Sequence, residues 1–174
     1  LEACLFGRRA GKAMAAYLRT EPRRPPLPVD GAEIAIEEVE TLLSREKKGD
    51  SSARAYAIKK DLQLAMQRRC GVFRNGPDLE ILQGEVKELQ ERYRTIHLDD
   101  RSRSFNMELI EAIEVGHLLD FAQVMVAGAL NRQESRGAQS RVDFPDRDDE
   151  QWLRHTLAYL RDGQVEFDDK PVTI

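Results

Sequence analysis

The sequence is poor in the residues on which most catalytic and metal-binding chemistry depends. Only two cysteines and three histidines occur among its 174 residues, and aromatic residues make up 6% of the chain. Cys4 and Cys70 lie far apart in apolar helical patterns, which predicts two reduced, buried thiols rather than a disulfide. His97, His117 and His155 fall in three different predicted elements, so no pair has the spacing of a zinc site.

The absence of several sequence motifs excludes further classes of function. The sequence contains no phosphate-binding G-x-x-x-x-G-K-[ST] or G-x-G-x-x-G loop and no G-x-S-x-G nucleophile elbow. Its 27 basic and 31 acidic residues are interspersed, which gives no electrostatic footprint for nucleic acid. The longest apolar run, Val124 to Leu130, is too short to span a bilayer. We therefore expect a helical module with an interaction surface and no autonomous catalysis.

Helical periodicity dominates residues 31–133. Apolar residues recur every three or four positions from Ile34 to Leu43, from Ala55 to Met66 and, most regularly, from Leu79 to Ile96. Short connections between such helices favour antiparallel neighbours, so the pattern predicts an up-down bundle of three or four helices.

Residues typical of helix N-termini precede two of these helices. Asp30 with Glu33 forms a capping-box pattern, and Ser51 or Ser52 is expected to cap the second helix. A fourth helix is expected from about Phe105 to Asn131. Its large apolar residues cover more than half of its circumference, which predicts a central position. These residues are Leu109, Ile110, Ile113, Leu118, Phe121, Met125, Val126 and Leu130.

The two ends of the chain differ from the bundle. Residues 1–20 predict a helix on which Gly7, Ala10 and Gly11 share one face, and such a face permits close approach of a partner backbone. Residues 21–30 form a proline-rich linker. Residues 134–174 hold a charged segment, a short helix near 148–153 and a hairpin signal at Asp162-Gly163. The paired carboxylates of the charged segment favour a salt-linked surface over acid–base catalysis.

Five stretches carry a resemblance to a known family. The segment LNRQESRGAQSRVDFPDRDDEQWLRHTL resembles the C-terminal signature of succinate dehydrogenase and fumarate reductase flavoprotein subunits. LQLAMQRRCGVFRN, RYRTIHLDDRSRSFNMELIEAIEVGHLLDFAQ, DDKPVTI and LEACLFGRRAGKAMA are similar to further segments of that family, in the same order.

This resemblance implies the C-terminal piece of a larger FAD-dependent subunit that oxidises succinate to fumarate. It implies a helix from the flavin-binding domain (residues 1–20), a linker (21–30), a mainly α three-helix bundle of spectrin-repeat type (31–133) and a small lobe with a short hairpin (134–174). Electrons would pass to an iron–sulfur subunit and then to quinone at a membrane anchor, which implies a peripheral, cytoplasmic location on the inner face of the cell membrane. The catalytic and flavin-binding residues would precede Leu1, the residue nearest to the flavin, so the chain itself should hold no cofactor or metal and show no activity.

The resemblance also suggests a role for the charged segment. We expect it to join the bundle to the flavin-binding domain and to the surface near the iron–sulfur subunit. The expected junction residues are Glu134, Arg136, Gly137, Arg141, Asp143, Arg147, Asp148 and Asp149. Gln139 departs from the family, which usually has histidine there. Because an amide cannot titrate near neutral pH, a structural role is favoured at this position.

Three alternatives stay open. The parent could be a fumarate reductase, since both enzymes share this region. L-aspartate oxidase is a weaker possibility, because its relatives usually read Ser-Arg-Gly-Leu-His. A free-standing helical interaction module is the non-enzymatic alternative, and a start codon just before Leu1 would favour it.

Overall fold

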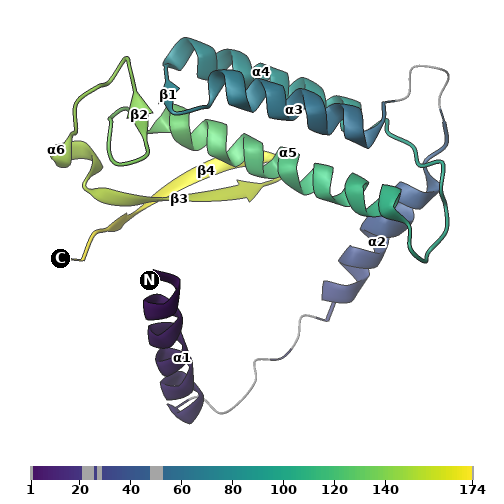
Figure 1. Cartoon of the computed structure of the whole chain (residues 1–174), viewed down its shortest axis with the longest axis horizontal. Coiled ribbons are helices and arrows are strands. Elements are labelled where there is room, and N and C mark those ends of the chain that lie inside the picture. Colours follow the sequence, from purple (N-terminus) through teal and green to yellow (C-terminus); the bar gives the residue numbers. More distant parts are fainter. Residues whose placement is uncertain (1, 21–25, 27–28, 48–52, 174) are drawn as a thin grey trace. The chain divides into compact units, whose positions relative to one another are not determined.

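Figure 1 shows the computed structural model of the chain, which describes residues 2–20, 26, 29–47 and 53–173. Contacts divide the chain into two compact units, Leu1–Glu37 and Glu38–Ile174. The elements are α1 (Glu2–Thr20), α2 (Gly31–Ser44), α3 (Ala55–Arg69), β1 (Phe73–Arg74), α4 (Gly76–Tyr93), α5 (Met107–Asn131), β2 (Ser140–Arg141), α6 (Asp149–Trp152), β3 (Arg154–Arg161) and β4 (Gln164–Pro171).

The first unit contains α1 and the beginning of α2. All described side chains of α1 are exposed, including Cys4, so the prediction of a buried thiol is wrong there and right only for Cys70. Apart from the helix's own backbone, no described atom lies within 4 Å of the position that a Cβ would take at Gly7 or Gly11. The close-packing face of α1 is thus present without a partner in the described part of this unit. Leu1 and most of the predicted linker lie outside the described residues.

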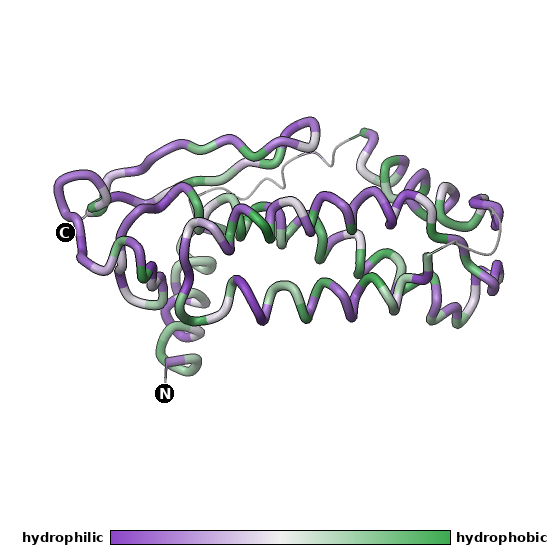
Figure 2. The backbone as a smooth tube through the Cα atoms, turned by 90° about the horizontal axis from the view of Figure 1, so that it is seen from above, coloured by the Kyte–Doolittle hydropathy of each residue, from purple (hydrophilic) through white to green (hydrophobic). Residues whose placement is uncertain are grey.

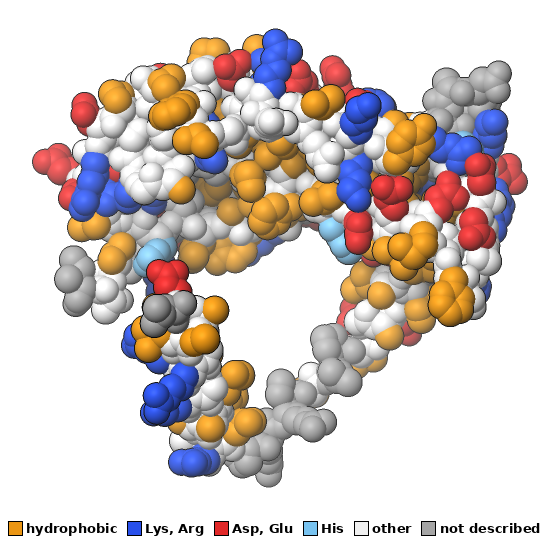
Figure 3. All heavy atoms as spheres, in the orientation of Figure 1, with side chains coloured by type: hydrophobic (Ala, Val, Ile, Leu, Met, Phe, Trp, Pro, Cys, Tyr) orange, Lys and Arg blue, Asp and Glu red, His pale blue; other side chains and the backbone are white. Residues whose placement is uncertain are grey.

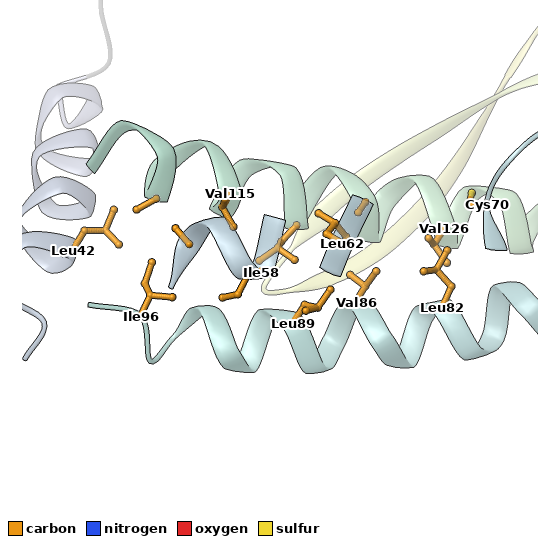
Figure 4. Packing of buried hydrophobic residues seen from close by; sticks show 14 of the residues in the cluster. Leu42, Ile58, Leu62, Cys70, Leu82, Val86, Leu89, Ile96, Val115 and Val126 are labelled. Carbon is orange, nitrogen blue, oxygen red and sulfur yellow. The ribbon is translucent and has the colours of Figure 1, made fainter. Parts of the chain in front are cut away.

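The second unit is built on a bundle of α3, α4 and α5, as the sequence predicts. Each helix turns one apolar face towards the other two, and α2 adds two leucines at one end (Figure 4). Each large apolar side chain buried in this way stabilises the fold by about 1.5–3 kcal/mol. The most deeply buried members are Leu42, Ile58, Leu79, Leu82, Val86, Ile96, Val115, Leu119 and Val126.

Side-chain caps set the beginnings of two bundle helices. The Asn75 side chain accepts a hydrogen bond from the Asp78 backbone N at 2.9 Å, and the Asn106 side chain accepts one from the Leu109 backbone N at 2.8 Å. At α3 the N-cap residue is Arg54, which makes no side-chain cap. The predicted caps, Ser51 and Ser52, lie outside the described residues.

Helix α5 packs differently from the sequence prediction. Its buried face combines three alanines, which let α3 and α4 approach closely, with two valines and one leucine: Ala112, Val115, Leu119, Ala122, Val126 and Ala129. Of the large residues expected at its contacts, Leu109, Ile113 and Leu130 are only partly buried, and Ile110, Leu118, Phe121 and Met125 are exposed. The prediction that large apolar residues over more than half of the circumference pack in a central position is therefore wrong for these four residues.

Helix α5 is also the one described helix that is long and apolar enough to cross a membrane by length and composition. The apolar run from Val124 to Leu130 is too short to predict this property. The whole helix has it because the turns that flank the run contain few charges. A core helix of a bundle has the same composition, and α5 buries one face against α3 and α4.

Two small strand pairs complete the unit. Strands β3 and β4 form the predicted antiparallel hairpin, whose turn residues Asp162 and Gly163 both have positive φ, as a type I′ turn requires. Strands β1 and β2 form a two-residue parallel pair that the sequence did not predict. In Figure 2, hydrophilic residues dominate the charged loops that join these strands to the bundle, and hydrophobic residues recur along the helices.

A pair of glycines in α5 gives a matched test of this packing. A Cβ added at Gly116 would lie 2.6 Å from the hydroxyl of Tyr93, which donates a hydrogen bond to the Ala112 carbonyl at 2.9 Å. A Cβ at Gly128 would meet no described atom within 4 Å. Gly116→Ala should lower the free energy of unfolding in urea by about 1–3 kcal/mol through overpacking. Gly128→Ala should raise it by up to about 1 kcal/mol through helix propensity. Equal changes at both sites would contradict the packing.

Candidate functional site

The charged segment after α5 is organised around one buried carboxylate, Glu134, whose side chain is 0% exposed. Its Oε1 accepts hydrogen bonds from Arg132 Nη1 and from Arg136 Nε, the latter at 2.8 Å. Its Oε2 accepts from Arg136 Nη2 and from the backbone N of Asp148, each at 3.0 Å. Two guanidinium groups and a backbone amide thus replace the water that the carboxylate loses on burial.

A second ion pair ties the end of α5 to the start of α4. Arg141, 2% exposed, donates to both oxygens of Asp143 at 2.8 Å and to the Ala129 carbonyl at 2.7 Å. Asp143 Oδ2 in turn accepts from the backbone N of Gly76, the first residue of α4, at 2.8 Å. A cation therefore lies at the C-terminus of α5 and an anion at the N-terminus of α4, which is the arrangement that both helix dipoles favour.

The outer part of the network is more exposed. Arg136 Nη2 also donates to Asp149 Oδ1 at 2.7 Å, and Arg147 holds both oxygens of Asp149 at 2.7 and 2.8 Å. Asp148 caps α6 by accepting from the backbone N of Glu150 and Gln151, each at 3.0 Å. These contacts fix α6 against the buried Glu134.

Arg132 links the network to the hairpin. Its Nη2 donates to the Arg154 carbonyl at 2.6 Å, and its Nη1 donates to the Trp152 carbonyl at 3.2 Å. The guanidinium carbons of Arg132 and Arg154 lie 5.2 and 5.1 Å from the centre of the Trp152 ring, within range of a cation–π contact. The sequence did not predict a role for Arg132, Trp152 or Arg154 in this network, although Arg132 lies only two positions before Glu134.

Gln139 and Gly137 have structural roles in the loop. Gln139 Oε1 accepts from Arg74 Nη1 at 2.9 Å, and Gln139 Nε2 donates to the Ala129 and Arg132 carbonyls, each at 3.4 Å. The amide therefore joins β1 to the end of α5, and this contact uses both its donor and its acceptor. Gly137 has a φ of 60°, a conformation that side chains disfavour.

The pKa values of the acidic groups follow from these contacts. Burial alone raises the pKa of Glu134, but the hydrogen bonds from Arg136, the Asp148 backbone and Arg132 outweigh it and lower the pKa overall. Hydrogen bonds from Arg141 hold the pKa of Asp143 far below its usual value. Hydrogen bonds from Arg147 and then Arg136 lower the pKa of Asp149 to about 2. All three groups are ionised at neutral pH, so none of them is suited to exchange protons there.

Other parts of the described chain carry no evident chemistry. No group of three His, Cys, Asp or Glu residues among the described residues could hold a metal ion. His117 is exposed, and its Nε2 lies 3.5 Å from Glu38 Oε1. A groove of about 920 Å³ between α4, α5 and the hairpin tip is crossed by a hydrogen bond of 2.8 Å between Gln90 and Gln123. The ion-pair network after α5 is therefore the candidate functional site among the described residues.

Seven of the eight residues predicted to form the junction make polar contacts, in two groups: Glu134, Arg136, Arg147, Asp148 and Asp149 form the first, and Arg141 and Asp143 form the second. Gly137 contributes only its backbone conformation. Glu134 and Arg141 face inwards, and Arg147 and Asp149 keep exposed surface, with side chains 60% and 50% exposed. Their predicted contacts with a flavin-binding domain and an iron–sulfur subunit stay predictions.

Removal of the buried carboxylate tests the network. Glu134→Ala should lower the free energy of unfolding by about 3–5 kcal/mol, because it leaves Arg132 without a carboxylate and Arg136 with only the half-exposed Asp149 as a partner. The control is Glu166→Ala, which breaks the exposed Arg161–Glu166 pair of the hairpin and should cost about 0–1 kcal/mol. Urea unfolding of both variants gives the comparison, and equal losses would rule out the structural role of Glu134.

The lowered pKa values predict sensitivity to acid. A carboxylate whose folded pKa lies below its unfolded value of about 4 stabilises the fold fully above that value and loses this contribution as the pH falls. The free energy of unfolding should thus decrease from about pH 5 to pH 2. Asp143→Asn should be less stable at neutral pH and should show a shallower decrease with acid, measured by urea unfolding at each pH. An unchanged slope in the variant would show that Asp143 does not contribute.

Comparisons with known proteins agree with this architecture. A family model described as the C-terminal part of the fumarate reductase flavoprotein matches residues 59–174. The fumarate reductase flavoprotein subunit of Mycobacterium tuberculosis is 38% identical over 176 residues, which cover 99% of this chain and 30% of the relative. The succinate dehydrogenase flavoprotein subunit of Rickettsia bellii is 34% identical over 175 residues, which cover 100% of this chain and 29% of the relative.

A solved structure supports the same conclusion. The quinol fumarate reductase of E. coli superimposes with a TM-score of 0.82 at 31% identity, over 97% of this chain and 29% of that one. The chain thus spans about 30% of the length of the curated relatives it matches. It belongs to the family of succinate dehydrogenase and fumarate reductase flavoprotein subunits and corresponds to their C-terminal domain, as its sequence motifs indicate.

Proposed function

We propose that this chain is the C-terminal region of an FAD-dependent subunit that oxidises succinate to fumarate and passes the electrons through an iron–sulfur subunit to quinone. The observation that carries the proposal is a match along the whole chain to flavoprotein subunits named for this chemistry. Relatives of both names match, so fumarate reduction is the alternative direction.

Within this subunit the chain has a structural role. The network holds α4, α5, α6 and the hairpin together, and a guanidinium group engages the carboxylates of Glu134, Asp143 and Asp149. The described residues do not fit FAD, because the two glycines with positive φ, Gly137 and Gly163, lie in the charged loop and the hairpin turn rather than before a long helix. The flavin site and the reacting groups belong to the preceding part of the polypeptide.

Contacts with neighbours fall to the exposed members of the charged segment. Arg147, Asp149 and the 57% exposed Val142 lie on its outer side and are suited to meet the flavin-binding domain or the iron–sulfur subunit. Helix α1, whose apolar and glycine-containing surface is uncovered in its own unit, is proposed to be the last helix of the flavin-binding domain. The complex would lie on the inner face of the cell membrane, held there by its anchor.

The test is succinate-dependent dye reduction by the full-length gene product, purified with its iron–sulfur subunit. We expect activity together with flavin absorbance near one flavin per subunit. The 174-residue chain alone is the control, and it should melt as a helical protein without flavin or activity. Comparison with fumarate-dependent oxidation of reduced dye gives the preferred direction.

Two results would contradict the proposal. Tight FAD binding by the 174-residue chain would place the cofactor site within it. A full-length product whose N-terminus lies near Leu1 and that carries no flavin would make the bundle a free-standing interaction module.

A further inference from the structure

An apolar stripe runs along the outer face of α5. Its members recur at helical spacing on the side that adjoins the buried alanines and valines, about a quarter turn around the helix. They are 71%, 47%, 42%, 66% and 39% exposed, in the order Met107, Ile110, Leu118, Phe121 and Met125. We call these five residues the α5 stripe; from its first to its last member it extends about 27 Å.

The described part of the second unit leaves this stripe uncovered. Helices α3 and α4 pack on the neighbouring face of α5, and the hairpin contacts another side, where Gln123 donates to the Gly163 carbonyl at 2.7 Å. Figure 3 shows hydrophobic side chains gathered over the middle of α5. Exposed apolar side chains gathered along one face mark an interaction site more often than scattered single ones do.

The N-terminal end of the stripe carries a further sign of an interface. Phe105, just before the α5 cap, is fully exposed and has a φ of 55°. An aromatic residue in the left-handed region costs about 1–3 kcal/mol, and such strain concentrates at functional positions. An exposed phenylalanine is also the kind of side chain that anchors an interface by filling a pocket.

The charge around the stripe limits its partner. Glu114, with a side chain 59% exposed, lies within the stripe between Ile110 and Leu118, and Lys59 of α3 pairs with it and with the neighbouring Glu111, each at 3.6 Å. A long, mainly apolar surface whose acidic residues are paired within the chain suits a permanent interface, since such interfaces are more apolar than transient ones. The charged segment differs, because its most central groups, Glu134 and Arg141, are already enclosed.

We propose that the α5 stripe is the surface on which the preceding flavin-binding domain of the same polypeptide docks. The curated relatives are more than three times as long as this chain, so a large covalently tethered partner is available. Tethering gives that partner a high effective concentration, which favours it over a second copy of the chain. The inference rests on the proposed function, because the flavin-binding domain is the occupant.

Photo-crosslinking in the full-length protein, purified with its iron–sulfur subunit, tests the docking directly. Phe121→p-benzoylphenylalanine places a reactive group on the stripe, and Leu64→p-benzoylphenylalanine places one at a 57% exposed position of α3. Irradiation and peptide mass spectrometry should join position 121 to residues that precede Leu1 in the same polypeptide, and position 64 should give no such product. Products of position 121 only with a second isotope-labelled copy, with the iron–sulfur subunit or with lipid would overturn the proposal.

Methionine oxidation gives a second measurement that needs no substitution. In the native full-length protein, peroxide should oxidise Met107 and Met125 at least about tenfold more slowly than in the urea-unfolded protein. Rapid oxidation of both residues would show an open stripe. Flavin content and succinate activity, measured on the same preparation, separate the two hypotheses. An active flavoprotein with an open stripe refutes the docking alone, and a covered stripe without flavin or activity refutes the proposed function and with it the identity of the occupant.

Discussion

The arrangement of the C-terminal half depends on the burial of one charge, the carboxylate of Glu134. A buried carboxylate is strongly unfavourable unless donors replace its hydration, and here Arg132, Arg136 and the Asp148 backbone supply them. Each donor comes from a different place: the residue after α5, the loop that follows and the cap of α6. The folded loop is therefore the conformation in which the charge finds all of its partners, and alternative loop conformations lose several of them together.

The remaining contacts extend this constraint to the rest of the unit. Arg132 also binds the first residue of the hairpin and contacts Trp152. The Arg141–Asp143 pair binds the end of α5 and the start of α4. A segment without regular structure thereby becomes a rigid connection among four elements. Under the proposed function, this rigidity keeps the surfaces proposed to meet the flavin-binding domain in a fixed relation to one another.

Local signals made much of the fold predictable. Apolar periodicity located the bundle helices, and Asp162-Gly163 located the hairpin, because these patterns act between near neighbours. The parallel pairing of β1 with β2 was not predictable, since it joins residues far apart in the sequence. The buried face of α5 was not predictable from its large apolar residues, because alanines form much of the contact, whereas Leu118 and Phe121 are exposed. For the site, the residue types were found but their burial was not, because burial depends on the tertiary arrangement.

The most direct test of this account is a double-mutant cycle on Glu134 and Arg136. Urea unfolding of Glu134→Gln, Arg136→Gln and the double variant gives the coupling free energy between the two side chains. If the buried pair organises the loop, the coupling should exceed about 1 kcal/mol, and the double variant should be less destabilised than the sum of the single variants. A coupling near zero would contradict the account, because it would mean that the loop holds its conformation without this interaction.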